Sequence, residues 1–121
     1  MIIGTIKEKK KFENRVAISP DEAKSYVKLG HQVQVEKNAG LQSGFSDKLY
    51  KEAGATISSA KDILKNSDIL VKINCPSTEE AKKLKSNSMV ISQLNTQSEI
   101  DSIKIFNSKK ISAFSLERVP R

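Results

Sequence analysis

The sequence predicts a doubly wound α/β fold, in which a mainly parallel sheet lies between two layers of helices. Short apolar runs rich in β-branched residues alternate along the chain with segments of helical periodicity. Serine–acid capping patterns precede several of the helical segments. The chain has 121 residues, of which 37% are hydrophobic and 29% charged, as expected for one globular domain. Alternating strands and helices imply right-handed crossovers and a three-layer, flavodoxin- or Rossmann-like arrangement.

The first third of the chain predicts two strands around one helix. Residues 2–6 form a short β-branched run typical of a buried first strand. Ser19-Pro20-Asp21-Glu22 places a hydroxyl at the N-cap, proline at the first helical position and an acid three residues after the cap. A helix is therefore expected over about 20–29, ended by a left-handed Gly30. Residues 32–36 alternate polar and apolar side chains and predict the second strand.

The middle of the chain predicts a loop and two helices. Gly40 and Gly44 lie in the loop, and Ser46-Asp47 can cap a small helix or turn near residues 47–57. Ser58 or Ser59 can cap the next helix, with Ile63 and Leu64 facing inward.

The second half predicts three further strands, which makes five in all. Residues 68–73 are the strongest candidate for a central strand, and Pro76 ends it. A second capping box begins at Ser77, and the remaining elements are expected as a strand over 89–94, a helix around Ile100, Ile103 and Phe106, and a strand over 111–114. Nothing after the last strand is expected to cover it, so the fold is expected to be incomplete, with one face of the sheet exposed.

Composition narrows the function classes. The net charge is +7, but the excess is spread along the chain, and no Trp, 2 Tyr and 4 Phe offer little for stacking on bases, which disfavours nucleic-acid binding. The single cysteine excludes an internal disulfide and favours a reducing compartment. No segment resembles a signal peptide or approaches the roughly 20 apolar residues of a membrane span.

Few residues predict chemistry on their own. The phosphate-binding patterns G-x-G-x-x-G and G-x-x-x-x-G-K-[ST] are absent, and Gly40 and Gly44 are interpreted as turn residues. His31, the only imidazole, stands at the start of a strand without a partner for acid–base catalysis. Cys75 lies at the ligand-binding end of the predicted central strand, although an inert thiol is the favoured interpretation.

Arginine residues are the stronger candidates for binding. Arg15 follows the first strand on the same side, where a guanidinium can hold a carboxylate or phosphate through two hydrogen bonds. An ion pair with Glu13 or Glu36 explains Arg15 equally well. Arg118 and Arg121 follow the last strand, again on the ligand side.

Motifs along the whole chain resemble the N-terminal segment shared by alanine dehydrogenases and the alpha subunit of proton-translocating NAD(P) transhydrogenase. The matching stretches are Ile3-Gly4-Thr5-Ile6-Lys7-Glu8, Glu13-Asn14-Arg15-Val16-Ala17-Ile18-Ser19-Pro20, Gly30-His31-Gln32-Val33, Ala39-Gly40, Phe45-Ser46-Asp47 and Ala53-Gly54-Ala55.

Three positions separate the two branches of this family. Alanine dehydrogenases carry a pattern like K-V-K-E-P, whose second lysine helps to hold the keto acid, where this chain has Asn74 in Lys72-Ile73-Asn74-Cys75-Pro76. Asn95 stands where those enzymes have a catalytic histidine, and an amide cannot transfer protons as a general acid or base. Arg121 matches an arginine that lies beside the nicotinamide in transhydrogenases. The resemblance therefore favours the transhydrogenase branch.

This resemblance implies a role in hydride transfer between NAD(H), bound by this component, and NADP(H), bound by a partner subunit, with coupled proton translocation and without a metal. Residues 1–121 would be the N-terminal subdomain of a homodimeric alpha subunit, without the glycine-fingerprint Rossmann domain and inactive alone. The implied partners are the beta subunit and the membrane domain, and the implied location is the cytoplasmic face of the bacterial inner membrane. Under a dehydrogenase alternative, Arg15 would bind the substrate carboxylate; a non-catalytic interaction domain is the remaining alternative.

Overall fold

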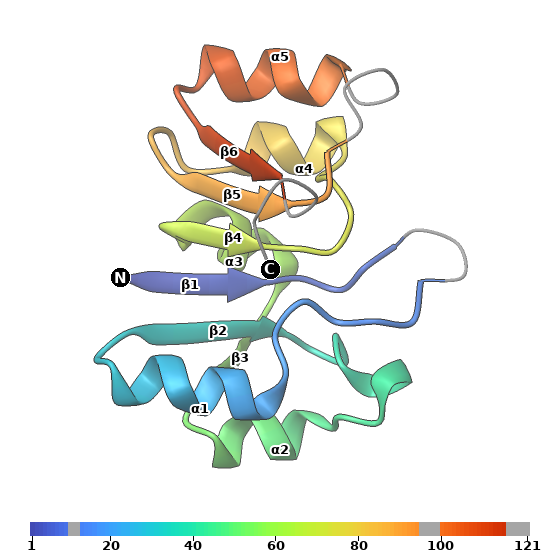
Figure 1. The fold of residues 1–121 in the computed structure, drawn as a ribbon, viewed down its shortest axis with the longest axis vertical. Coiled ribbons are helices and arrows are strands. Elements are labelled where there is room, and N and C mark those ends of the chain that lie inside the picture. The colour runs from blue at the N-terminus through green and yellow to red at the C-terminus, as the bar shows by residue number, and fades with distance from the viewer. Residues whose placement is uncertain (10–12, 95–99, 116–121) are drawn as a thin grey trace.

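A computed structural model of the chain describes residues 1–9, 13–94 and 100–115 and contains one parallel sheet flanked by helices (Figure 1). The six strands follow the order β3-β2-β1-β4-β5-β6, and every neighbouring pair is parallel. The elements are β1 (Ile2–Thr5), α1 (Pro20–Lys28), β2 (Gln32–Glu36), the 3₁₀ helix η1 (Leu41–Ser43), α2 (Asp47–Glu52), β3 (Thr56–Ser58), α3 (Ala60–Asn66), β4 (Ile69–Val71), α4 (Thr78–Lys83), β5 (Met89–Ser92), α5 (Ile100–Ser108) and β6 (Ser112–Ser115).

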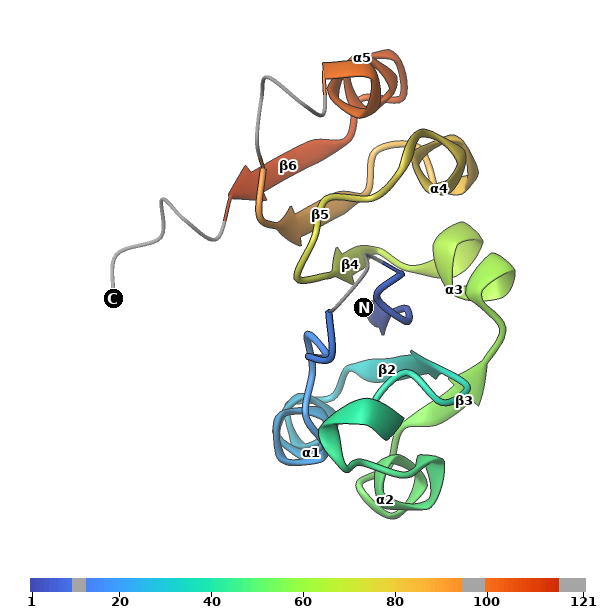
Figure 2. The same cartoon turned by 90° about the vertical axis from the view of Figure 1, so that its right-hand side faces the viewer.

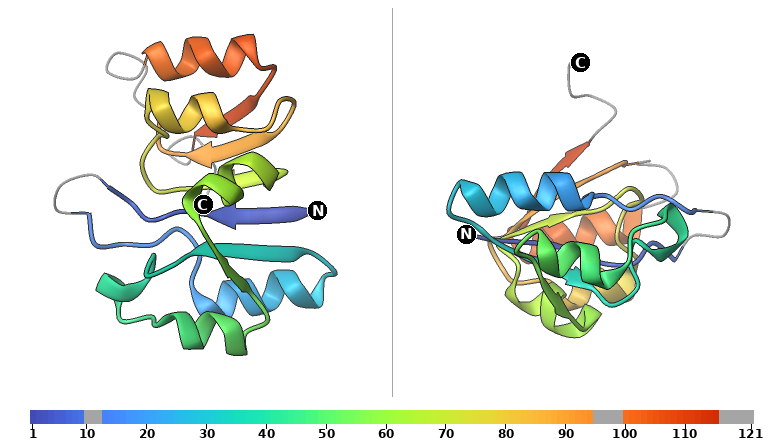
Figure 3. Two further views of the ribbon diagram at one scale, coloured as in Figure 1. Left: turned by 180° about the vertical axis from the view of Figure 1, so that it is seen from behind. Right: turned by 90° about the horizontal axis from the view of Figure 1, so that it is seen from below.

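Helices cover the sheet from both sides, as the sequence predicts. Figure 2 shows α3, α4 and α5 along one side and α1 on the other, and Figure 3 shows the first group from behind. Each side has its own apolar core. One core lies beneath α3, α4 and α5 and is formed by Ile6, Ile63, Leu64, Leu70, Ala81, Leu84, Val90, Phe106 and Ile111. The other lies beneath α1 and α2 and is formed by Ile3, Ile18, Ala23, Val33, Val35, Ala39, Tyr50 and Ala55.

Local capping signals place the helix starts correctly. Ser19 and Glu22 form the reciprocal capping box of α1, and Ser77 forms one with Glu80 at α4. Of the two serines proposed to cap the third helix, Ser59 accepts the hydrogen bond from the Asp62 N–H. These contacts satisfy N–H groups that have no partner within the first turn of a helix, which fixes where the chain changes direction.

The expected number of strands is wrong by one. Residues 56–58 form the edge strand β3 in a region where the sequence predicts only a helix or turn. This strand pairs with β2 through the register Gln34–Thr56, Val35–Ile57 and Glu36–Ser58. A strand of three residues is too short to show an alternating pattern, so its conformation depends on pairing with β2.

One face of the sheet stays partly exposed beyond β4. Val90 of β5 points into the core under α4 and α5, whereas Phe114 of β6 is in register with Ile91 and belongs to the opposite face. Phe114 is 50% exposed. No helix in the described part of the chain has the length and apolar character needed to cross a membrane.

Candidate functional site at the switch point of the sheet

The loops after β1 and β4 leave the sheet side by side, because β1 and β4 are neighbours whose following helices cover opposite faces. This is the switch point of a doubly wound sheet, where ligands bind beyond the carboxyl ends of the strands. Charged side chains from both loops meet there. The charged ones are Glu8, Glu13 and Arg15 from the first loop and Lys72 and Glu80 from the second loop and α4, and the neutral amide of Asn74 lies among them.

Glu8 connects the two loops through its buried carboxylate. Its oxygens accept hydrogen bonds from the main-chain N–H of Ile73 at 2.9 Å and of Asn74 at 3.1 Å. These two N–H groups follow the end of β4, on residues that are only partly exposed. The carboxylate therefore fixes the backbone on which Asn74 is presented.

Lys72 lies between two carboxylates. Its Nζ is 3.6 Å from Glu8 Oε1 and 3.5 Å from Glu80 Oε1, and only 4% of its side chain is exposed. Glu80 also closes the capping box of α4, where its Oε1 accepts a hydrogen bond from the Ser77 N–H at 3.0 Å. One ammonium group thus joins the loop after β1 to the first turn of α4. A buried charge requires such compensation, because an isolated one is costly to remove from water.

Arg15 forms an ion pair with Glu13, one of the two partners that the sequence analysis names for it. Its Nε and Nη2 donate to the two Glu13 carboxylate oxygens at 2.9 and 3.0 Å. The hydrogen bonds from Arg15 lower the pKa of Glu13 from 4.5 to about 2. Glu36, the other proposed partner, instead accepts a hydrogen bond from the Lys7 N–H at 2.8 Å. The guanidinium remains at the surface, with 64% of the side chain exposed.

Asn74 completes the cluster by donating to both carboxylates of the first loop. Its Nδ2 lies 3.1 Å from Glu13 Oε1 and 3.4 Å from Glu8 Oε1. Three carboxylates and three cations meet around this amide if Lys9, 4.0 Å from Glu80 Oε2, is included. The described cluster is therefore electrically balanced.

The other described residues that the sequence analysis considers are not members of this cluster. His31 precedes β2 and so lies at the opposite edge of the sheet, away from Asn74. Cys75 is half-buried next to the cluster, with its Sγ 3.5 Å from the Pro76 carbonyl oxygen. Gly40 and Gly44 flank η1, and Gly44 has a φ of 85°, which agrees with the interpretation as turn residues.

Three residues singled out in the sequence, Asn95, Arg118 and Arg121, lie outside the described residues. Within the described ranges, no group of three or more His, Cys, Asp or Glu side chains is arranged to hold a metal ion.

Sequence reasoning missed three members of the cluster: Glu8, Lys72 and Glu80. A signal was present for Lys72, because a lysine inside the apolar run of residues 68–73 must find a countercharge if that run is buried. The identity of the countercharges required the sheet order, since Glu8 precedes Lys72 by more than sixty positions in the sequence.

The fold and the site define a doubly wound α/β domain with a charge-balanced cluster at its switch point. Residues 4–121 match the family described as the N-terminal domain of alanine dehydrogenase and PNT, and the chain belongs to this family.

Relatives from both branches are similar to this chain. It is 35% identical over its full length to the NAD(P) transhydrogenase subunit alpha of Haemophilus influenzae, of which it covers 23%. It is 36% identical over 98% of its length to the alanine dehydrogenase of Methanococcus maripaludis, of which it covers 32%. A crystal structure of transhydrogenase from Sinorhizobium meliloti matches the whole chain with a TM-score of 0.93 and 32% identity, over 36% of that protein. The chain thus spans about a quarter to a third of the length of these relatives.

Proposed function

We propose that this chain is the N-terminal part of the NAD(H)-binding component of a proton-translocating NAD(P) transhydrogenase. Similarity alone does not separate this function from an alanine dehydrogenase, because the two branches match the chain about equally well. The choice depends on the side chains at the switch point.

Asn74 is the observation that supports the transhydrogenase branch. The family resemblance puts the keto-acid-binding lysine of alanine dehydrogenases at this position, and here a neutral amide donates to Glu8 and Glu13. A keto acid needs a positive charge for its carboxylate, and this cluster has no excess of cations to provide one. Arg15 is exposed but already holds the carboxylate of Glu13 through two hydrogen bonds. We therefore assign Arg15 a structural role; a substrate role for it belongs to the dehydrogenase alternative.

Hydride transfer between two nicotinamides requires no acid or base from the protein, only contact between the rings and a suitable environment. In this proposal the complete alpha subunit binds NAD(H), and a partner subunit brings NADP(H) to it. The present residues contribute the scaffold at the switch point of the sheet, and Arg121 lies beside the nicotinamide. Residues 1–121 are inactive on their own, because the part of the protein with the glycine fingerprint follows them.

The same proposal includes the subunits with which the alpha subunit assembles and its location in the cell. The alpha subunit forms a homodimer, contacts the beta subunit and the membrane domain, and lies at the cytoplasmic face of the bacterial inner membrane. The relatives named as alpha subunits support a multi-subunit enzyme.

Calorimetric titration of NADH into the complete gene product tests this function, with NADPH as competitor and alanine plus NAD⁺ as the turnover control. Tight binding of NADH, weak competition by NADPH and no oxidation of alanine are expected. Reduction of NAD⁺ that depends on alanine would establish the dehydrogenase alternative instead.

A further inference from the structure

The N-terminal edge of the sheet, where the strands begin, carries most of the unbalanced positive charge of the described surface. Each helix runs antiparallel to the strands, so the C-terminus of every helix lies at this edge, on the left in Figure 1. Its exposed lysines are Lys28, Lys51, Lys65, Lys82, Lys83 and Lys110. The carboxylates near them are Glu52 and Asp68, and Asp68 is neutralised by Lys85 at 2.6 Å. The first turns of α1, α4 and α5, at the other edge, are acidic instead, and those of α2 and α3 carry one acid and one lysine each.

Helix dipoles explain the position of these lysines but not their excess. A cation at the C-terminus of a helix is favourable, and Lys109 fills this role for α4 by donating to the carbonyl oxygens of Lys82 and Leu84. Lys82 and Lys83, on the last turn of the same helix, add two further exposed charges. The edge therefore carries more positive charge than the helix ends need.

Two apolar side chains project from the same basic edge. Leu29, at the C-cap of α1, is 74% exposed, and Met1, before β1, is 66% exposed. These are the highest values among the large hydrophobic side chains of the described residues. They come from adjacent strand starts, since the Gln32 N–H donates to the Met1 carbonyl oxygen at 3.0 Å. Exposed apolar side chains among lysines are typical of surfaces that enter the interface of a bilayer.

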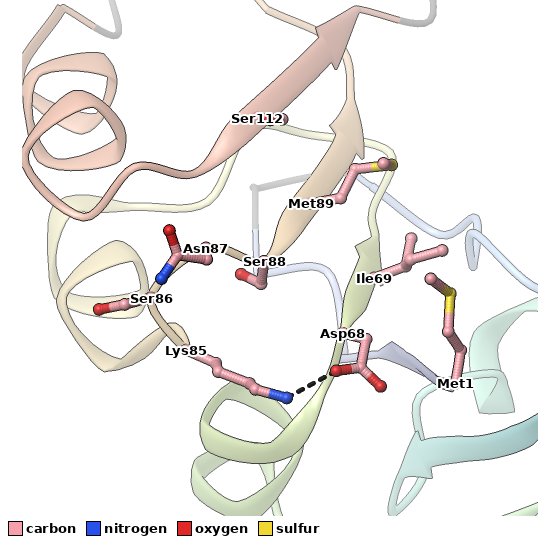
Figure 4. Close-up of a pocket in the computed structure, with 9 residues that line it drawn as sticks. All are labelled: Met1, Asp68, Ile69, Lys85, Ser86, Asn87, Ser88, Met89 and Ser112. Carbon is pink, nitrogen blue, oxygen red and sulfur yellow. Dashed lines mark hydrogen bonds and ion pairs between the residues drawn. The ribbon is translucent and has the colours of Figure 1, made fainter.

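A hollow between the first residues of β4, β5 and β6 also opens at this edge, with a volume of about 650 Å³ (Figure 4). Lys85 and Ser88 line it. Ser88 is only 5% exposed, and its Oγ has no hydrogen-bond partner among the described residues. The Ser88 hydroxyl is a donor suited to a phosphate oxygen, and the Lys85 ammonium, although paired with Asp68 in the same hollow, keeps further N–H groups for one.

We propose that the N-terminal edge of the sheet docks on an anionic lipid bilayer. Leu29 and Met1 enter the interface, the lysines lie over the headgroups, and the hollow receives a headgroup phosphate. The exposed cations of this edge are all lysines, point charges suited to diffuse attraction by a charged surface, which favours a bilayer over nucleic acid. This inference depends only on the described surface and is independent of the proposed hydride transfer.

The absence of tryptophan from the chain provides a direct test. In the full 121-residue chain, Leu29→Trp places a single fluorophore at the proposed contact, and Leu41→Trp places one at the opposite edge, where Leu41 is 57% exposed. Vesicles containing 30 mol% phosphatidylglycerol in phosphatidylcholine should shift the emission of Leu29→Trp to the blue and leave Leu41→Trp unchanged. Pure phosphatidylcholine vesicles should shift neither.

Charge-reversal variants test whether membrane binding depends on the lysines of this edge or only on the net charge of the protein. Lys28→Glu with Lys110→Glu should weaken partitioning at least about 25-fold, from about fivefold for each lysine lost. Lys48→Glu with Lys61→Glu changes the charge equally at the opposite edge and should cost less than about fivefold, because screening limits its reach to about 8 Å. Equal losses in the two pairs, or no shift for Leu29→Trp, would overturn the proposal. Displacement by millimolar inorganic phosphate, or tighter binding to duplex DNA than to vesicles, would also overturn it.

Discussion

Glu8 accepts a hydrogen bond from the main-chain N–H of Asn74, so a residue just beyond the first strand fixes the backbone beyond the fourth. The two residues are 66 positions apart in the sequence and meet because β1 and β4 are neighbours in the sheet. Through this contact and the Lys72 ammonium, the switch point forms one connected unit.

Lys72→Met should destabilise the fold strongly. The substitution leaves Glu8 and Glu80 buried without their shared cation, and removing one member of a buried charge group costs about 3–5 kcal/mol. Urea unfolding should show this loss in the free energy of unfolding. Lys61→Met, at an exposed position in the first turn of α3, is the control and should change it by less than about 0.5 kcal/mol. Equal effects of the two substitutions would show that Lys72 has no special role.

Arg15→Gln should raise the pKa of Glu13 from about 2 toward its ordinary value of 4.5, because the main cause of the lowered pKa is lost. Carboxyl-carbon NMR during an acid titration measures this directly. A carboxylate with a lowered pKa in the folded state stabilises the fold above pH 4.5, and this contribution is lost as the pH falls from 4.5 to about 2. The variant should therefore lose stability less steeply in that range. An unchanged Glu13 pKa in the variant would contradict the assignment.

Gly4→Ala should be destabilising by about 1–3 kcal/mol, because it adds a carbon atom where β1 packs closely on α3. A Cβ at this position would lie 2.6 Å from Ile63 Cγ2 and would also clash with the Ser67 hydroxyl. Thermal unfolding of Gly4→Ala, Ile63→Ala and the double variant measures the coupling. The double variant should lose less stability than the sum of the two single variants. Additive losses would exclude steric conflict with Ile63 as the cause.

Tyr50→Phe should remove part of the alkaline sensitivity of the fold. Burial, with smaller contributions from the Glu22 and Asp47 carboxylates, raises the pKa of Tyr50 from 10 to about 12. The neutral phenol stabilises the fold below pH 10, and this contribution is lost as the pH rises from 10 to about 12. The variant should also lose about 1–2 kcal/mol at neutral pH, since the Ile18 carbonyl oxygen loses its donor. Guanidinium unfolding at several pH values measures both effects, and parallel pH profiles for the two proteins would disprove the first.

Arg121→Ala in the complete gene product should weaken NADH binding or slow hydride transfer at least about tenfold, equivalent to ~1.4 kcal/mol. The reason is its proposed position beside the nicotinamide. Calorimetry measures NADH binding, and stopped-flow reduction of an NADP⁺ analogue with the partner subunit present measures hydride transfer, with Lys104→Ala on the exposed side of α5 as the control. Wild-type NADH affinity and wild-type turnover in the Arg121 variant would show that Arg121 does not belong to the nicotinamide site.

Much of the fold was predictable from the sequence because its signals are local. The capping boxes at Ser19 and Ser77 and the left-handed Gly30 mark helix ends through contacts within a few residues. The strand β3 was not predictable in this way, since its three residues adopt an extended conformation only beside β2. The pairing of Arg15 with Glu13 was accessible as one of two alternatives, and the structure selects it.

The sequence by itself therefore determined the class of fold, the starts of the capped helices and the family, because each depends on patterns along the chain. Only the tertiary structure decided which charges meet at the switch point and which edge of the sheet collects the lysines. Lys72 gains Glu8 as a partner because β1 lies beside β4, and Lys28 and Lys110 share an edge because every helix runs antiparallel to the strands. Electrostatic interactions depend on distance in space, which sheet order sets and sequence separation does not.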